Sequence, residues 1–308
     1  MKANSIIAID LGGTNLKAAL LNLKYKIIDK KIFKTGNFIK QERLISAIVN
    51  SVKDIKNEHH LSKSDILGVG LGLPGPIDVE RGLVHFFPNI PGWKEVRLKN
   101  ILIQRLGFPI FLDNDANLMC LAEKRLGAAR PFKNAVCLTL GTGVGGGIII
   151  EGKLYRGKGF AAGEIGHIPI NENGPGCNCG GRACLEAYIG NNMILREAKK
   201  SLGREISLEE LSLLAEKGNK KAKAIWSRVA GRLGLALAGI VNLLNPDCIV
   251  IGGGVANAGK ILFDKVEEVI AKRAMSIQAK HVKVIKSRLG CDAGLIGAAI
   301  LVKEGLSA

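Results

Sequence analysis

Residues 6–21 read Ile6-Ile7-Ala8-Ile9-Asp10-Leu11-Gly12-Gly13-Thr14-Asn15-Leu16-Lys17-Ala18-Ala19-Leu20-Leu21: an apolar run, a glycine turn and a second apolar run. Residues 135–150 repeat this pattern around Gly141-Thr142-Gly143-Val144-Gly145-Gly146-Gly147. Each copy predicts a β-hairpin whose turn carries little side-chain bulk. Two copies of one unit, each early in its half of the chain, predict two related lobes with a cleft between them.

The two glycine turns are candidates for holding a polyphosphate from both sides. Glycine lets backbone N–H groups approach an anion closely, and Thr14 and Thr142 add hydroxyl donors. Neither turn contains the Gly-Lys-Ser/Thr of a P-loop. One such turn alone is explained as well by the conformation of the chain as by phosphate binding. The repeat of the turn is what favours phosphate binding. Asp10 ends the first strand, where a carboxylate would hold hydrated Mg²⁺ or cap the turn.

The residues between the hairpins alternate between helix-like and strand-like patterns. Helices are expected near residues 41–60 and 98–106, with strands at 66–73 and 109–112. The first lobe is therefore expected to end near residue 117.

A candidate catalytic carboxylate follows the strand at 110–112, where the chain reads Asp113-Asn114-Asp115-Ala116-Asn117 ahead of a helical pattern. Ligands of open α/β sheets bind at the carboxyl ends of strands. A hydroxyl that attacks a phosphoryl group benefits from a carboxylate that accepts its proton. Asp113 and Asp115 compete for this role, and the other is expected to cap the helix. Spacing alone does not choose between them.

One histidine and three cysteines, His167, Cys177, Cys179 and Cys184, lie within a short glycine-rich stretch. Their number and softness match a closed, tetrahedral structural zinc site. Free thiols or a redox pair are the alternatives. An imidazole that binds zinc through one nitrogen can donate a hydrogen bond with the other, so His167 could also contact a substrate hydroxyl. Glu164 and Glu186 flank the cluster as further acceptors.

The composition argues against nucleic-acid-binding, secreted and membrane proteins. The 308 residues are 47% apolar, enough for a sizeable core, and the excess of Lys and Arg gives a net charge of +17. Because the basic residues are scattered without interleaved aromatics, no nucleic-acid partner is expected. Seven cysteines and a first stretch that does not resemble a secretory signal predict a cytoplasmic protein without a disulfide framework, and no apolar run predicts a membrane span.

Taken together, these motifs resemble the ROK family of sugar kinases and repressors, within the actin-like or hexokinase-like superfamily, over nearly the whole chain. The resemblance rests on Asp10-Leu11-Gly12-Gly13-Thr14, Leu73-Pro74-Gly75-Pro76, Pro88-Asn89, Asn114-Asp115-Ala116-Asn117, the turn at 140–147, Glu164-Ile165-Gly166-His167, the cluster ending in Cys184-Leu185-Glu186, and Ile251-Gly252-Gly253-Gly254. It implies an α/β, two-lobed, ribonuclease H-like ATPase fold with a duplicated core and an interlobe cleft. The lobes would comprise residues 1–117, completed by a helix at about 292–308, and residues 118–291.

The resemblance also implies a role for each matching residue. Asp115 would be the general base that takes the proton of the hexose 6-hydroxyl. The sugar would be held by Gly75, Asn89, Asn114, Asp115, Glu164, His167 and Glu186. Magnesium and ATP would be held by Asp10, Gly12, Gly13, Thr14, Asn15, Lys17, Gly141, Thr142 and Gly143, with Gly252, Gly253 and Gly254 at the adenosine end.

The expected activity is ATP-dependent hexose phosphorylation, with structural zinc. Residues 74–78 and 88–93 look most like the glucokinase branch, so glucose is the first expectation; kinases for N-acetylmannosamine, N-acetylglucosamine, fructose and allose are alternatives. A repressor, which is one alternative to a kinase, would carry a DNA-binding segment ahead of Asp10. A non-catalytic sugar-binding regulator is the other alternative. Family members are often dimers, so a homodimer or higher homo-oligomer is expected. Ala183 stands where the family usually has glycine, so its backbone must avoid a positive φ or tolerate strain.

Overall fold

The structure, a computed structural model, describes residues 4–38, 40–87 and 90–307. The chain forms two compact units. The first contains the residues up to Ala122, the loop Arg156–Ala162 and the residues from Cys291 onward, and the second contains Glu123–Tyr155 and Gly163–Gly290.

A five-stranded sheet of order β3-β2-β1-β4-β7 forms the centre of the first unit. Its strands are β1 (Ser5–Leu11), β2 (Asn15–Asn22), β3 (Ile27–Lys34), β4 (Ile66–Leu73) and β7 (Ile110–Asn114), with a separate small hairpin of β5 (Ile77–Asp78) and β6 (Leu83–Val84). The pairs β1–β2 and β2–β3 are antiparallel, whereas β1–β4 and β4–β7 are parallel. The continuous apolar run of β1 is buried almost throughout, and the edge strand β3 alternates between half-buried and exposed positions.

The second unit repeats this topology with the order β10-β9-β8-β11-β12. Its strands are β8 (Ala135–Leu140), β9 (Val144–Ile150), β10 (Lys153–Tyr155), β11 (Cys248–Gly252) and β12 (Lys283–Lys286). Again two antiparallel pairs are followed by two parallel pairs. The duplicated core that the sequence predicted is therefore confirmed, strand for strand.

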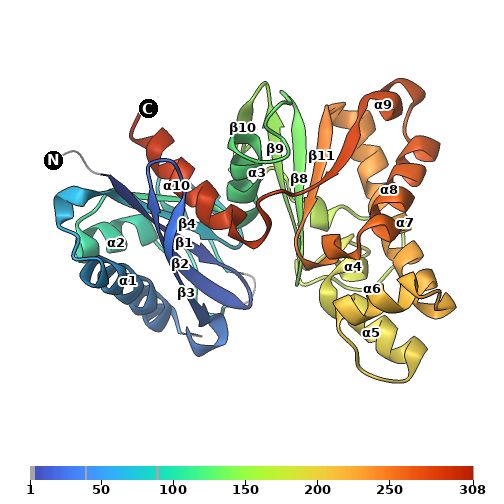
Figure 1. The fold of residues 1–308 in the computed structure, drawn as a ribbon, viewed down its shortest axis with the longest axis horizontal. Coiled ribbons are helices and arrows are strands. Elements are labelled where there is room, and N and C mark those ends of the chain that lie inside the picture. Colours follow the sequence, from blue (N-terminus) through green and yellow to red (C-terminus); the bar gives the residue numbers. More distant parts are fainter. Residues whose placement is uncertain (1–3, 39, 88–89, 308) are drawn as a thin grey trace. The chain divides into compact units, whose positions relative to one another are not determined.

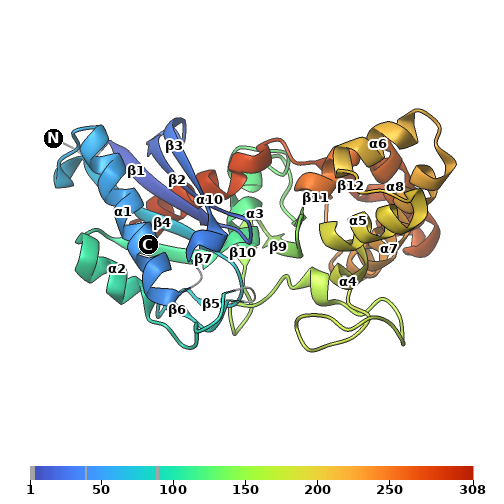
Figure 2. The ribbon, with the colours of Figure 1, turned by 90° about the horizontal axis from the view of Figure 1, so that it is seen from below.

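Helices cover the sheets. The first unit has α1 (Gln41–Glu58), α2 (Leu98–Leu106), most of α3 (Asp115–Arg125) and α10 (Ala293–Gly305), and α10 packs on β1 and β4 (Figure 1). The second has α4 (Glu186–Ile189), α5 (Asn191–Leu202), α6 (Leu208–Glu216), α7 (Lys220–Leu244), α8 (Lys260–Arg273) and α9 (Ser276–His281), with α7 and α8 packed together (Figure 2). Short 3₁₀ turns are η1 (Thr35–Phe38), η2 (Lys63–Asp65), η3 (Ile165–His167), η4 (Gly254–Ala258) and η5 (Gly290–Asp292).

Each unit has its own apolar core and its own tryptophan. Trp93 is 4% exposed in the core of the first unit and stacks on Phe87, with ring centroids 4.3 Å apart. Trp226 lies on α7, fully buried in the core of the second unit. By length and composition, α7 is the one helix among the described residues that is long and apolar enough to span a membrane. However, 61% of its apolar 18-residue stretch is buried inside the molecule, as in the core helix of a soluble protein.

The helix α3 passes from the first unit into the second and is anchored at its far end by a buried carboxylate. Glu123 is 0% exposed, and its Oε1 accepts hydrogen bonds from the Ser287 hydroxyl at 2.6 Å and from the Arg288 and Leu289 amides at 3.0 Å. Because a buried carboxylate needs such donors, these bonds fix the end of α3 against the segment that follows β12.

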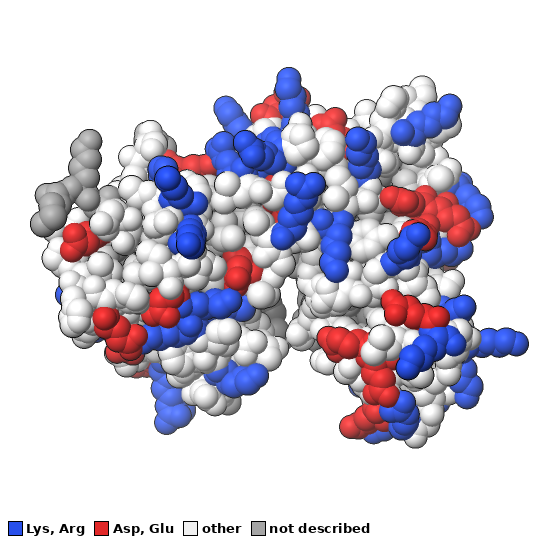
Figure 3. All heavy atoms as spheres, viewed as in Figure 1, with Lys and Arg blue, Asp and Glu red and all other residues white. Residues whose placement is uncertain are grey.

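The charged residues on one face of the molecule are scattered, as they are in the sequence. On the face drawn in Figure 3, Lys and Arg lie in several groups with Asp and Glu between them.

Candidate functional site

The first glycine turn joins β1 to β2 and is held by backbone bonds. The Gly12 amide donates to the Asn15 carbonyl at 2.9 Å. Thr35, which begins η1, donates its hydroxyl to the Gly12 carbonyl at 2.8 Å and its amide to the Thr14 carbonyl at 3.0 Å. The exposed residues Gly13 and Thr14 therefore sit on a turn that Thr35 braces, and nothing in the local sequence pattern points to Thr35.

Asp10, at the end of β1, is paired with a predicted neighbour. Its Oδ2 accepts from the Lys17 ammonium at 3.0 Å, and the same ammonium donates to the Cys291 carbonyl at 2.8 Å, just ahead of α10. The Asp10 side chain is 14% exposed. The structure thus places Asp10 and Lys17 together beside the first turn.

The second glycine turn joins β8 to β9 and lies against the start of α5. The Gly141 amide donates to the Gly143 carbonyl, and the Asn191 amide donates to the Gly141 carbonyl, both at 2.9 Å. Asn191 also has a buried side-chain oxygen without a hydrogen-bond partner. Asn191 was not predicted, and only its place at the start of a helix could have drawn attention to it.

Gly252, Gly253 and Gly254 lie beside this second turn, because β11 pairs with β8 and both strands end at the same edge. Gly253 has φ +85°, and a methyl group on it would lie 2.2 Å from the Leu140 carbonyl oxygen. Only glycine both adopts this positive φ without strain and leaves room for the Leu140 carbonyl. The structure therefore brings the predicted adenosine glycines next to the predicted phosphate turn at one carboxyl edge of the sheet.

Geometry separates the two candidate bases. Asp113 is 1% exposed, and both of its oxygens are occupied: Oδ2 by Arg156 at 2.8 and 2.6 Å, and Oδ1 by the Asn114 amide and the Asn117 side chain. Asp115 is half-buried at the first position of α3, and its Oδ1 accepts from the Ala116 amide at 2.8 Å.

The expectation that the unused aspartate caps the helix is wrong. Asn114 is the cap: its Oδ1 accepts from the Ala116 amide at 2.9 Å and from the Asn117 amide at 3.2 Å. Its Nδ2 donates to the Gly75 carbonyl at 3.1 Å, and this bond joins two of the residues that are predicted to bind the sugar. Asn89, a third, lies outside the described residues.

The segment Glu164–His167 packs directly on β9. A methyl group on Gly166 would lie 2.2 Å from the Val144 carbonyl oxygen, so only glycine allows this approach. Glu164 is 47% exposed, and His167 Nε2 lies 3.8 Å from its Oε2. Desolvation raises the pKa of the Glu164 carboxyl; His167 lowers that pKa and Glu186 raises it, so the three groups lie within electrostatic reach.

Glu186, at the start of α4, reaches the second turn. Its Oε2 accepts a hydrogen bond from the Val144 amide at 2.8 Å, where β9 begins. One carboxylate of the predicted sugar clamp is therefore fixed to the end of the predicted phosphate turn, within the second unit.

Gly166→Ala is expected to disturb this arrangement. The methyl group must push η3 away from β9, at a cost of about 1–3 kcal/mol in unfolding free energy. We expect a lower melting temperature and weaker retention of bound metal, measured by thermal unfolding and metal analysis. Gly176→Ala, where an added methyl group meets nothing within 4 Å, is the matched control. Equal behaviour of the two variants would contradict this packing argument.

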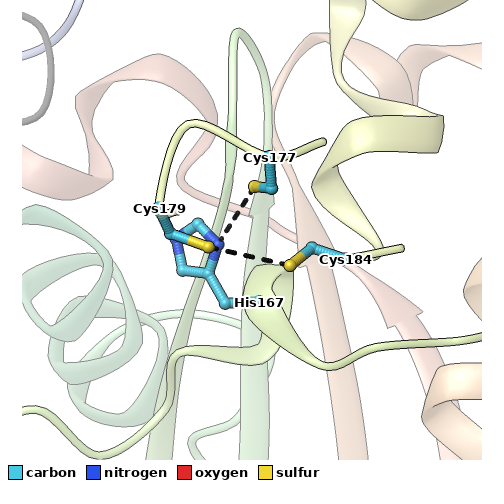
Figure 4. A group of neighbouring side chains, drawn as sticks. All are labelled: His167, Cys177, Cys179 and Cys184. Carbon is cyan, nitrogen blue, oxygen red and sulfur yellow. Dashed lines mark hydrogen bonds between the residues drawn. The ribbon is translucent and has the colours of Figure 1, made fainter. Parts of the chain in front are cut away.

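His167, Cys177, Cys179 and Cys184 converge on one point (Figure 4), with their ligand atoms all within 4.8 Å of one another. Cys177 Sγ lies 3.6 Å from His167 Nδ1, and Cys179 Sγ lies 3.7 Å from Cys184 Sγ. Ligands at tetrahedral zinc distances would be separated by about 3.6 Å for S···N and about 3.8 Å for S···S. The four residues therefore fit a tetrahedral zinc ion, and His167 Nε2 is left on the side of Glu164.

The cysteine loop is pinned at its base by backbone bonds: the Ala183 amide donates to the Pro175 carbonyl, and the Cys177 amide to the Gly181 carbonyl, each at 2.9 Å. Burial raises the pKa of Cys184 to about 12, whereas backbone hydrogen bonding lowers the pKa of Cys179. Ala183 has φ +58° and is 1% exposed, so of the two alternatives left open at this position the backbone takes the positive φ and tolerates its strain.

A family model described as "ROK family" matches residues 6–305. The chain belongs to the ROK family. It is 36% identical to a glucokinase of Thermotoga maritima over 97% of both chains, and 30% identical to a xylose repressor of Caldicellulosiruptor bescii over 98% of this chain and 79% of the repressor. A solved ROK glucokinase of Streptomyces griseus, in complex with glucose and AMPPNP, is 31% identical, with a TM-score of 0.85, and is matched over its whole length and 98% of this chain.

These ROK relatives confirm the family that the motifs resembled and the two-lobed, actin-like and hexokinase-like kinase fold.

Proposed function

We propose that this ROK protein transfers the γ-phosphoryl group of ATP to the 6-hydroxyl of a free hexose, with glucose as the first substrate. The observation that carries the proposal is the end-to-end match to glucokinases, one of them solved with glucose and an ATP analogue. The alternatives are kinases for N-acetylmannosamine, N-acetylglucosamine, fructose or allose.

Asp115 is the general base of this proposal. Asp113 is buried and both its oxygens are occupied, whereas Asp115 is half-buried beside Asn114, which contacts Gly75. The Asp115 carboxylate accepts the proton of the sugar hydroxyl as the bond to phosphorus forms. This assignment chooses between the two candidates that spacing left open.

The sugar is held by Gly75, Asn114, Glu164, His167 and Glu186, with Asn89 as a further contributor. Glu164 and Glu186 accept from sugar hydroxyls, and His167 offers Nε2 while its Nδ1 faces the cysteines. A zinc ion held by His167, Cys177, Cys179 and Cys184 would be closed to substrate, and it would stiffen the loop and orient the imidazole.

ATP is held as its magnesium complex. The turns at Gly12–Asn15 and Gly141–Gly143 offer backbone amides to the phosphates, Lys17 supplies positive charge, and Asp10 faces Mg²⁺, which neutralises phosphate charge when bound. Gly252, Gly253 and Gly254 border the adenosine. The protein would act in the cytoplasm as a homodimer or higher homo-oligomer, without a nucleic-acid or membrane partner.

The test is ADP release from Mg-ATP with a panel of glucose, mannose, fructose, allose and the two N-acetylated hexosamines, with the product analysed by ³¹P NMR. We expect the highest kcat/KM with glucose and a phosphate ester at the 6-position. A higher kcat/KM for another hexose would change the substrate and keep the mechanism. Because one relative is a repressor, binding of a sugar without turnover of any would instead identify a regulator.

A further inference from the structure

The loop Arg156–Ala162 belongs to the first unit although the residues on both sides of it belong to the second. It leaves at the end of β10 and is closed on itself, since the Ala162 amide donates to the Arg156 carbonyl at 3.0 Å. Gly163 follows it, and Glu164 comes next. The loop therefore departs from its sequence neighbours to contribute to the unit that contains Asp115.

Arg156 is the residue of this loop that contacts the catalytic segment. Its Nε and Nη2 donate to Asp113 Oδ2 at 2.8 and 2.6 Å. The Asp113 side chain is 1% exposed and that of Arg156 is 26% exposed. A carboxylate this buried needs a partner charge with good geometry, and a guanidinium supplies both.

Asp113 passes this restraint on to both sides of Asp115. Its Oδ1 accepts from the Asn114 backbone amide at 2.8 Å, one residue before Asp115, and from the Asn117 side chain at 3.0 Å, two residues after it. The start of α3 is thus attached to the Asp113 carboxylate at two points. The other carboxylate oxygen is held by Arg156.

We propose that Arg156 is a positioning residue for phosphoryl transfer: through Asp113 it fixes the start of α3, and with it the carboxylate of Asp115. This rests on the proposed role of Asp115 as general base. A base displaced by about 1 Å costs roughly 10²-fold in rate even when substrates still bind. The effect of losing Arg156 should therefore appear in kcat and not in the binding of ATP.

The first variant is Arg156→Met, which keeps the length of the aliphatic stem and removes the charged head group. We expect kcat with the best hexose to fall about 10- to 100-fold, while KM for ATP stays within about twofold. Arg156→Lys restores the charge without the two-pronged contact, so we expect partial recovery of kcat. Arg228→Met is the matched control, because Arg228 of α7 pairs with Glu197 of α5 at the surface; it should leave kcat unchanged.

A second variant separates positioning from stability. Arg156→Met leaves the buried Asp113 charge without its partner, which lowers stability. The double variant Asp113→Asn with Arg156→Met removes that charge, so we expect its melting temperature to return toward that of the wild type. If Arg156 positions the base, kcat stays low in the double variant.

Two outcomes would overturn the proposal: wild-type kcat in folded Arg156→Met, or recovery of kcat together with the melting temperature in the double variant. Failure of the proposed function is a different result. In that case the wild-type protein itself turns over no hexose, and the positioning role falls with it because there is no transfer step to position.

Discussion

Asp115→Asn is expected to lower kcat for hexose phosphorylation by at least about 10² to 10⁴, because the amide cannot accept the proton of the attacking hydroxyl. The substitution keeps the size of the side chain and its ability to accept the bond that Asp115 Oδ1 receives from the Ala116 amide. Folding should therefore be little affected. Binding of the hexose and of ATP should persist, because proton transfer belongs to the chemical step.

The measurement is steady-state ADP release, with calorimetric titration of the hexose to show that binding is retained. Asp264→Asn is the matched control, since Asp264 is an exposed residue of α8. Turnover near the wild-type rate in Asp115→Asn would remove Asp115 as the base. The retained binding distinguishes loss of the chemical step from loss of the site.

Cys179→Ser is expected to release the metal and to raise KM for the hexose by roughly 10- to 100-fold. Zinc binds thiolate far better than hydroxyl. Cys179 is exposed, so the smaller oxygen leaves no cavity and the core of the second unit is unaffected. His167 would lose the ion that fixes its ring, so the sugar contact weakens while the glycine turns that hold ATP keep their backbone bonds.

Zinc content is measured in the purified protein, together with KM for the hexose and for ATP. Cys291→Ser is the control, because Cys291 is exposed and lies outside the cluster. We expect one zinc per chain in the wild type and in the control, and less than one in Cys179→Ser. A wild-type protein that contains no zinc and yet has the same KM as the variant would exclude the structural role.

The local pattern of the sequence was sufficient for the duplicated hairpins and the first helices, whereas the ribonuclease H-like fold was implied by the family resemblance. Each apolar run, glycine turn and apolar run became a β-hairpin, and the predicted helices at 41–60 and 98–106 appear as α1 and α2. These features depend on near neighbours, so periodicity and turn residues carry them. The His/Cys cluster was equally visible, because its four residues lie within one short stretch and the structure brings all four together.

The family resemblance implied Asp115 as the base, and the observation that supports this proposal over Asp113 involves a partner far away in the sequence. Arg156 is separated from Asp113 by 43 positions, and no local pattern reveals that ion pair. The glycines of the two turns were predicted to contact phosphates and Gly253 to contact adenosine. The structure adds that Gly253, like Gly166, is required where backbones approach each other closely. A single sequence does not distinguish these reasons, because glycine serves both.

The two tryptophans of the chain give each unit its own optical probe. Trp93 is packed against Phe87 in one core and Trp226 is enclosed in the other, so the two indoles report on different parts of the molecule. In Trp93→Phe the remaining emission follows the second unit alone, and in Trp226→Phe it follows the first. Coincident denaturation curves from the two variants would mean that the halves unfold as one cooperative system, and separated curves would give each half its own stability.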